Sequence, residues 1–220
     1  MRQIFLDTET TGLDPKSGHK IIEIAAVEML NRQVTDNQFH VYLNPMREID
    51  EAAQEVHGLT LEFLSDKPLF KDIANDFITF IKGSELVIHN APFDLGFLNV
   101  ELQLIGYQTV DTFVEGVIDS LVIARSMRPG QRNSLDALCK AYGVDNSERS
   151  LHGALLDSRL LAEVYVGMTR GQEALEMNFA EKSHNNTLLT SADYKKIPVM
   201  KANANELKLH QEYVEKIKIN

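Results

Sequence analysis

The chain has 220 residues, 44% of them hydrophobic, which is enough for one globular domain with a packed core and an appended tail. Its single cysteine, Cys139, excludes a disulfide framework and a cysteine-rich zinc site. Its formal net charge of -10 argues against a protein that binds nucleic acid by electrostatic attraction alone, since such proteins depend on clustered Lys and Arg.

The acidity belongs to the first 170 residues, which hold 25 acidic and 15 basic side chains, while the last 50 residues balance. An enzyme that acts on phosphate esters can carry such a charge, because bound divalent cations reverse the local field at a carboxylate-rich site. No apolar stretch has the length of a membrane span, and the apolar run near the N-terminus is too short for a signal peptide. We therefore expect a cytoplasmic protein with no membrane partner.

Three segments with the composition of β-strands come first, at residues 2–6, 20–30 and 39–43. Turn-forming residues separate them, among them Thr35, Asp36 and Asn37, and the order predicts an antiparallel meander. Apolar spacing then predicts a helix at 70–82, a strand at 85–89, and helices at 93–105, from 135 onward and at 153–168. This order of elements is typical of an α/β domain.

After Gly171 the periodic pattern weakens. We expect three regions: a folded domain at 1–171, a flexible linker at 172–203, and an amphipathic helix within 204–220. Leu207, Val214 and Ile217 would form the apolar face of that helix. A helix at the end of a linker suits a docking function, although such helices are more often plain surface elements.

Asp7 and Glu9 directly follow the apolar run Ile4-Phe5-Leu6. Side chains two apart in a strand point to the same face, so both carboxylates would project together. Two oxygen donors that converge in this way suit a hard divalent cation such as Mg²⁺ or Mn²⁺. An isolated Asp-x-Glu is more often a solvated pair at a strand end, so the metal-site hypothesis needs further carboxylates.

Two later motifs supply them. Asp94 ends the motif His-Asn-Ala-Pro-Phe-Asp, which follows a predicted strand and opens a predicted helix. His152 stands at another helix entrance, five positions before Asp157, an arrangement that suits a base working beside a metal ligand. Alone, Asp94 would be a helix-dipole partner and His152 a solvated loop residue. Four carboxylates and one imidazole at strand ends and helix starts are far more specific together.

The motifs Asp-Thr-Glu-Thr-Thr-Gly, His-Asn-Ala-Pro-Phe-Asp and His-Gly-Ala-Leu-Leu-Asp, in this order, resemble those of the DEDD exonucleases, histidine subtype. Residues 1–170, about three quarters of the chain, are similar to the epsilon branch, the proofreading exonucleases of bacterial DNA polymerase III. The resemblance implies a ribonuclease H-like α/β fold with a five-stranded mixed sheet flanked by helices. It also implies 3′ to 5′ hydrolysis at DNA 3′ ends, single-stranded or frayed, that releases nucleoside 5′-monophosphates.

The same resemblance assigns the five catalytic residues. Asp7, Glu9 and Asp157 would hold two divalent metal ions, Mg²⁺ or Mn²⁺, and Asp94 would ligate one of them directly or through water. His152 would remove the proton from the attacking water, a role that suits histidine because its side chain titrates near neutral pH.

Substrate contacts follow from the resemblance as well. Thr10, Leu13 and His57 would contact the terminal nucleotide, beside Asp7, Glu9 and Asp157. The sequence departs from the best-known epsilon pattern at two positions, where Ala52 stands in place of Glu and Leu13 in place of Met.

In the tail, Gln172, Leu175 and Met177 form a Gln-x-x-Leu-x-hydrophobic peptide that resembles the motif that binds the sliding clamp beta. The resemblance also places the polymerase alpha subunit on the C-terminal segment, adds a small accessory theta-type subunit as a partner, and locates the protein at the replisome on the nucleoid.

Two alternatives stay open. The same five residues serve DEDD exonucleases that act on RNA or on repair intermediates. A non-catalytic adaptor between polymerase and clamp would be recognised by the loss of one of the five, and none is lost. A hydrolase of some other phosphoester fits the five residues but not the surrounding motifs.

Overall fold

The computed structural model of the protein describes residues 1–149 and 151–170, together with residues 206, 208, 210, 211 and 214. Contacts divide the chain into two units, Met1–Gln172 and Glu173–Asn220, and the elements below belong to the first. The five described residues of the second unit are helical. The rest of the helix expected at 204–220, the linker expected at 172–203 and the clamp-binding peptide lie outside the described residues, so the expected division into regions stays a prediction.

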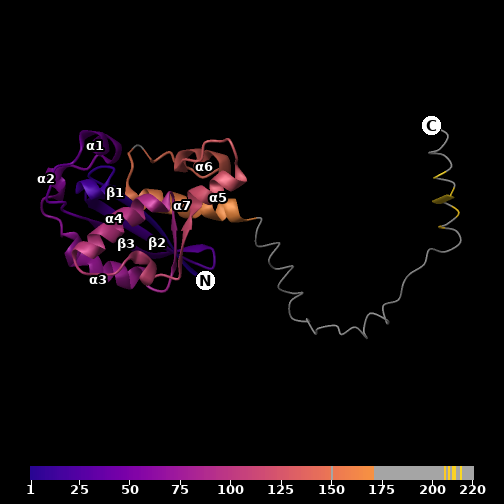
Figure 1. Cartoon of the computed structure of the whole chain (residues 1–220). Helices are drawn as coiled ribbons and strands as arrows, with labels where there is room; N and C mark the ends of the chain where they lie inside the picture. Colours follow the sequence, from indigo (N-terminus) through magenta and orange to yellow (C-terminus); the bar gives the residue numbers. More distant parts are fainter. Residues whose placement is uncertain (150, 171–205, 207, 209, 212–213, 215–220) are drawn as a thin grey trace, which may run out of the picture. The chain divides into compact units, whose positions relative to one another are not determined.

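A five-stranded sheet with the strand order β3-β2-β1-β4-β5 forms the middle of the first unit (Figure 1). Strands β1 (Arg2–Thr10), β2 (Ile21–Leu30) and β3 (Gln33–Tyr42) pair antiparallel in chain order. Strands β4 (Glu85–Ile88) and β5 (Gly116–Asp119) continue the sheet parallel to β1. This mixed sheet with flanking helices confirms the predicted fold class and the predicted meander.

The hairpin between β2 and β3 corrects the sequence analysis. The turn lies at Asn31 and Arg32, whose φ angles are 49° and 66°, and not at Thr35–Asn37, which belongs to β3. Positive φ at both residues of a two-residue turn matches the right-handed twist of the strands it joins. Polar residues are tolerated at 35–37 because β3 is an edge strand whose side chains there are exposed or half-buried.

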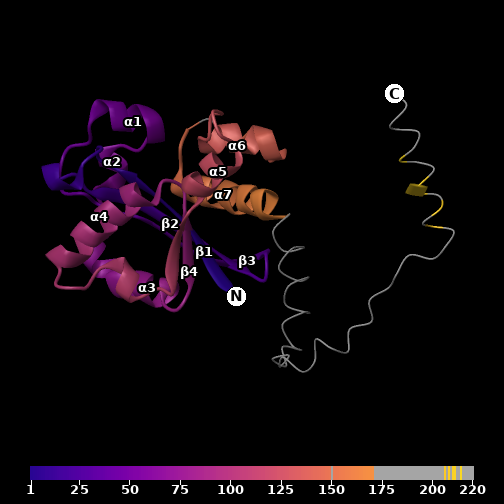
Figure 2. The same cartoon turned by 45° about the vertical axis from the view of Figure 1, so that its right-hand side comes forward.

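Helices cover both faces of the sheet. Helices α3 (Phe70–Ile81) and α4 (Ala91–Leu104) pack on one face, while α5 (Ser120–Met127), α6 (Leu135–Tyr142) and α7 (Ala154–Thr169) pack on the other (Figure 2). Several short elements were not predicted from the sequence: α1 (Glu51–His57), α2 (Leu61–Leu64), α5, and the 3₁₀ turns at Pro15–Ser17 and Val110–Thr112. None of the described helices is long and apolar enough to cross a membrane.

The alternation of β1 decides which helix each of its side chains meets. Ile4 and Leu6 pack with α3 and α4, whereas Phe5 packs with α6 and α7. Phe5 is fully buried and meets the ring of Tyr165 edge-on at 5.4 Å between centroids. Burial of such a side chain contributes about 2 to 3 kcal/mol, so the face assignment of β1 is strongly fixed. The odd-numbered residues that follow Phe5 therefore point towards α7.

Candidate active site

Asp7 and Glu9 lie within β1, which continues to Thr10 instead of ending at Leu6. They pair across the antiparallel ladder with Ala25 and Glu23 of β2. As odd-numbered residues they share the face of Phe5, so both carboxylates project towards the start of α7. Asp7 is half-buried and Glu9 is buried.

Asp94 reaches the same place from the opposite face of the sheet. Helix α4 begins after Asn90, whose φ of 70° turns the chain sharply at the end of β4, and Asp94 lies in the first turn. Its carboxylate is buried, and the hydroxyl of Thr8 donates a hydrogen bond of 2.7 Å to Oδ1. Because Thr8 lies between Asp7 and Glu9 in the strand, this bond ties the α4 carboxylate to β1.

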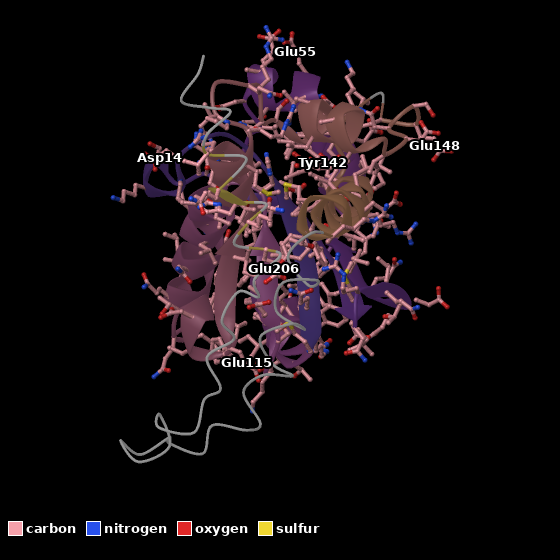
Figure 3. The ribbon with its side chains drawn as sticks, turned by 90° about the vertical axis from the view of Figure 1, so that its right-hand side faces the viewer. Asp14, Glu55, Glu115, Tyr142, Glu148 and Glu206 are labelled. Atoms are coloured by element: carbon pink, nitrogen blue, oxygen red, sulfur yellow. The ribbon has the colours of Figure 1, made fainter. Side chains whose placement is uncertain are left out.

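Asp157 comes from the first turn of α7 and is buried. Arg149 donates to both of its oxygens, Nε to Oδ1 and Nη2 to Oδ2, each at 2.6 Å. The third guanidinium nitrogen, Nη1, lies 2.7 Å from Oδ1 of Asp136 in α6. The neighbouring Glu148 points outward at the edge of the molecule (Figure 3). The side chain of Arg149, in contrast, is only 6% exposed.

His152 precedes α7 in a loop that its backbone N–H ties to the carbonyl of Val56, at 3.0 Å. Its side chain is 46% exposed. The imidazole Nδ1 accepts a hydrogen bond of 2.9 Å from Arg149 and lies 3.4 Å from Oδ2 of Asp157. One potential ligand atom each of Glu9, His152 and Asp157 lies within 4.8 Å of the other two, a spacing that can hold a metal ion. Asp7 and Asp94 are not part of that tight group.

All five predicted catalytic residues line one cleft of about 830 Å³. Its other lining side chains include Arg125 and Arg128 on the side of α5, and His89 and Asn90 at the end of β4. The fold thus brings together residues separated by up to 150 positions of sequence, because the ends of β1 and β4 and the starts of α4 and α7 meet here.

Three of the carboxyl groups in this cleft have raised pKa values, with burial as the main cause. Burial, followed by the charges of Asp94, Glu9 and Asp157, holds the pKa of Asp7 well above its usual value. Burial, followed by the charge of Glu23, raises the pKa of Glu9 to about 8, and burial raises that of Asp94 to about 7. Such crowding of acids destabilises the fully ionised cleft unless a cation is bound there.

The pKa of Asp157 moves the other way. Burial opposes its ionisation, but the hydrogen bonds from Arg149 and the positive charge of its guanidinium outweigh burial and lower the pKa. Asp157 is therefore the carboxylate that stays ionised most readily, and Arg149 is its counter-charge. Arg149 was not predicted from the sequence, because a single arginine in a loop belongs to none of the motifs. Its position three residues before His152 was the one available signal.

The predicted nucleotide contacts gather in a second, smaller pocket of about 250 Å³ next to the cleft. Thr10, Leu13, Ala52 and His57 line it together with Glu9. The hydroxyl of Thr10 donates to the carbonyl of Gly12 at 2.6 Å and so shapes the turn, while Leu13 is 84% exposed at the rim. With Ala52 in place of a longer acid, this wall carries no charge of its own at that position.

His57 is buried, and its Nδ1 accepts a hydrogen bond from the backbone N–H of Leu59 at 3.0 Å. In the neutral ring Nε2 must then carry the proton. Within the described part of the chain, Nε2 is the one buried side-chain nitrogen or oxygen atom without a hydrogen-bond partner. Burial also lowers the pKa of His57. A buried donor without a partner in a pocket suits an acceptor group on a ligand.

Residues 4–165 match a family model described as Exonuclease. The chain is 52% identical to the DNA polymerase III subunit epsilon of Rickettsia prowazekii (strain Madrid E), over 100% of this chain and 98% of that protein. It is 47% identical to the subunit of the same name from Pasteurella multocida (strain Pm70), over 97% of this chain and 88% of that protein. The chain belongs to the epsilon family of exonucleases. It is a 3′–5′ proofreading exonuclease, of a family that uses divalent metal ions.

Solved structures of other exonucleases share this fold. Exonuclease X in complex with 5′ overhanging duplex DNA is 27% identical, with a TM-score of 0.60 over 77% of this chain and 92% of that one. E. coli Exonuclease I in complex with a dT13 oligonucleotide has a TM-score of 0.66 over 81% of this chain and 43% of that one. At 17% identity the second likeness shows the fold alone. Family membership favours proofreading over the RNA-processing and adaptor alternatives.

Proposed function

We propose that Asp7, Glu9 and Asp157 hold two divalent ions, Mg²⁺ or Mn²⁺, and that Asp94 ligates one of them directly or through water. The observation that carries this proposal is the crowding of four carboxylates in one cleft, where three of them have raised pKa values. An all-oxygen donor set of this kind fits hard divalent cations. Bound there, such ions lower the pKa of a water molecule and stabilise the charge that develops on the departing 3′ oxygen.

His152 is the general base of this proposal. It takes the proton from the water that attacks the terminal phosphodiester. Its partial exposure and its place beside Glu9 and Asp157 support this role, because a base in a loop at the mouth of a cleft can exchange its proton with solvent. The carboxylate of Asp157 at 3.4 Å stabilises the imidazolium that forms.

The terminal nucleotide occupies the pocket lined by Thr10, Leu13 and His57. The unpartnered Nε2–H of His57 donates to an oxygen of that nucleotide, and the exposed side chain of Leu13 packs on its base. Asp7, Glu9 and Asp157 lie on the cleft side of this pocket, next to the scissile phosphate. A mispaired 3′ end frays more often than a paired one and so reaches this pocket as a single strand.

The chain acts as part of the DNA polymerase III assembly at the replisome. What supports this assignment is that its relatives in Rickettsia prowazekii and Pasteurella multocida are named as subunits of DNA polymerase III. We assign the clamp beta to Gln172, Leu175 and Met177 and the alpha subunit to residues 204–220. A theta-type subunit is the third partner. What supports the tail assignments is that the Rickettsia prowazekii relative aligns over the whole chain, tail included.

An exonuclease assay tests the proposed function. The full-length chain is incubated with Mg²⁺ or Mn²⁺ and a 5′-labelled single-stranded DNA, with an RNA of the same sequence and Asp7→Ala as controls. We expect stepwise shortening from the 3′ end that is lost in Asp7→Ala and much slower on RNA. Faster trimming of RNA, or no cleavage of either strand, would overturn the proposal.

A further inference from the structure

One segment of this acidic protein carries only positive charge. Residues 120–135 contain Arg125, Arg128 and Arg132 and no Asp or Glu, whereas residues 1–170 as a whole hold 25 acidic side chains against 15 basic ones. The segment forms α5 and the loop to α6, and Arg125 and Arg128 line the 830 Å³ cleft. The cleft is therefore lined by the catalytic carboxylates and, on the side of α5, by an arginine wall that consists of Arg125 and Arg128.

Arg128 holds the loop in shape. Its Nη1 donates to the carbonyl of Arg132 at 3.2 Å and to Oδ1 of Asn133 at 3.3 Å, and its Nη2 donates to Oε1 of Gln131 at 3.0 Å. Asn133 donates in return to the carbonyl of Gln131 at 3.0 Å. The charge of Arg128 is thus largely used within the loop, which it fixes beside the cleft.

Arg125 and Arg132 differ from Arg128. Both are exposed, and among the described residues neither guanidinium makes a hydrogen bond or an ion pair. The two acids that flank the segment are already engaged. Asp119 accepts from the backbone N–H groups of Asn90 and Leu121, and Asp136 is paired with Arg149. Arg125 lines the cleft, and Arg132 stands between Gln131 and Asn133, which also line it. The two guanidinium groups, which have no partner among the described residues, therefore add positive charge to this side of the cleft.

We propose that Arg125 and Arg132 bind the backbone phosphates of single-stranded DNA that lie 5′ to the scissile bond. The inference rests on the proposed function, which places the terminal nucleotide in the His57 pocket and the scissile phosphate at the carboxylates. The remaining strand then leaves on the far side of the cleft, along α5. Acidic side chains elsewhere on the protein repel phosphates, whereas the exposed guanidinium groups on this side are the side chains best suited to bind them.

Cleavage and strand binding would then depend on different residues. The carboxylates and His152 cleave any phosphodiester of a terminal nucleotide, while Arg125 and Arg132 determine how well a longer strand is held. The rate of hydrolysis of a small substrate with no further phosphate should not depend on the two arginines. Binding of a longer strand should become less dependent on salt when they are removed, because each phosphate contact contributes about 0.7 to the salt dependence of single-strand binding.

The variants Arg125→Gln, Arg132→Gln and the double variant test this proposal in the full-length chain. The matched control is Lys71→Gln combined with Lys140→Gln, which removes the same charge from two exposed side chains that do not line the cleft. Two substrates are compared: a 5′-labelled single-stranded DNA at several NaCl concentrations, and the p-nitrophenyl ester of thymidine 5′-monophosphate, which has one phosphate.

We expect the double arginine variant to raise KM for the DNA by about tenfold at low salt, with kcat changed by less than about twofold. The negative slope of log(kcat/KM) against log[NaCl] should become shallower by about 1.4, which is twice the value for a single contact. The double arginine variant should hydrolyse the ester at the wild-type rate. The double lysine variant should have the wild-type KM and salt dependence for the DNA. Three results would overturn the inference: an unchanged KM and slope, an equal loss in the lysine variant, or a loss of ester hydrolysis in the arginine variant. Failure of the wild-type chain to cleave either substrate would instead defeat the proposed function.

Discussion

Arg149 grips both carboxylate oxygens of Asp157, with Nε and Nη2 each 2.6 Å from its acceptor. The two side chains are 6% and 4% exposed, so the pair is nearly dry. A metal ion at this site would bind the same two oxygens of Asp157. The Nη1 atom of Arg149 also forms an ion pair with Oδ1 of Asp136, at 2.7 Å. A divalent ion that binds Asp157 would therefore compete with Arg149 for these oxygens.

Arg149→Met should destabilise the metal-free protein and leave the metal-bound protein less affected. Removal of one partner from a buried ion pair leaves the other charge uncompensated, which costs about 3 to 5 kcal/mol of unfolding free energy. Urea unfolding at pH 7.5 in EDTA and in Mn²⁺ measures both states. Arg149→Lys is the control that keeps the charge. Equal losses of stability in EDTA and in Mn²⁺ would contradict the exchange of Arg149 for metal.

The metal-free protein should lose stability as the pH rises from about 4.5 to 8. Glu9 and Asp94 have folded-state pKa values of about 8 and about 7, above their unfolded values. A raised carboxyl pKa contributes stability that is complete below the unfolded pKa and is lost as the pH rises through the folded one. Urea unfolding in EDTA at pH 5, 6, 7 and 8 should show a fall on the order of a few kcal/mol. Glu9→Gln should flatten this dependence, and an equally steep fall in that variant would contradict the assignment.

His152→Ala should lower kcat and leave KM for single-stranded DNA close to that of the wild type. Loss of a general base costs about 10²- to 10⁴-fold in rate. Because the side chain is 46% exposed, the fold should tolerate the change, and the unfolding midpoint serves as the check. Steady-state kinetics at saturating Mg²⁺ measure the effect. A fall in kcat of less than about tenfold would mean that another group accepts the proton.

His57→Leu should separate stability from substrate binding. The buried Nε2 has no partner among the described residues, so replacing the ring by an apolar side chain removes an unsatisfied donor. We expect an unfolding free energy at or above that of the wild type, and a KM raised about tenfold or more by the loss of one hydrogen bond to the nucleotide. His57→Gln, which can still donate, should recover part of the binding. An unchanged KM in His57→Leu would exclude a contact with the substrate.

The sequence predicted the parts of the site that are encoded locally. Short motifs reveal all five positions: Asp7 and Glu9 lie in the second half of β1, Asp94 and Asp157 lie in the first turns of helices, and His152 lies just before one. Arg149 was missed because its partners come from α6 and α7, and only the fold brings them together. The roles of the five residues stay predictions, although the structure places all of them in one cleft.

The elements that the sequence did not predict have weak local patterns. Strand β5 has the sequence Gly-Val-Ile-Asp, in which two apolar residues are too few to stand out between helices. The turn at Asn31 and Arg32 depends on positive φ angles, which those residue types allow but do not require. Helix α5 carries the arginine wall, and its amphipathic pattern spans only two turns.

The most direct test of the central claim is a calorimetric titration of the full-length chain with Mn²⁺ in the presence of deoxythymidine 5′-monophosphate. If Asp7, Glu9, Asp94 and Asp157 form a metal site, two ions should bind per chain, and Asp7→Asn and Asp157→Asn should each lose at least one of them. The same stoichiometry and affinity in those variants as in the wild type, or no Mn²⁺ binding at all, would contradict the account.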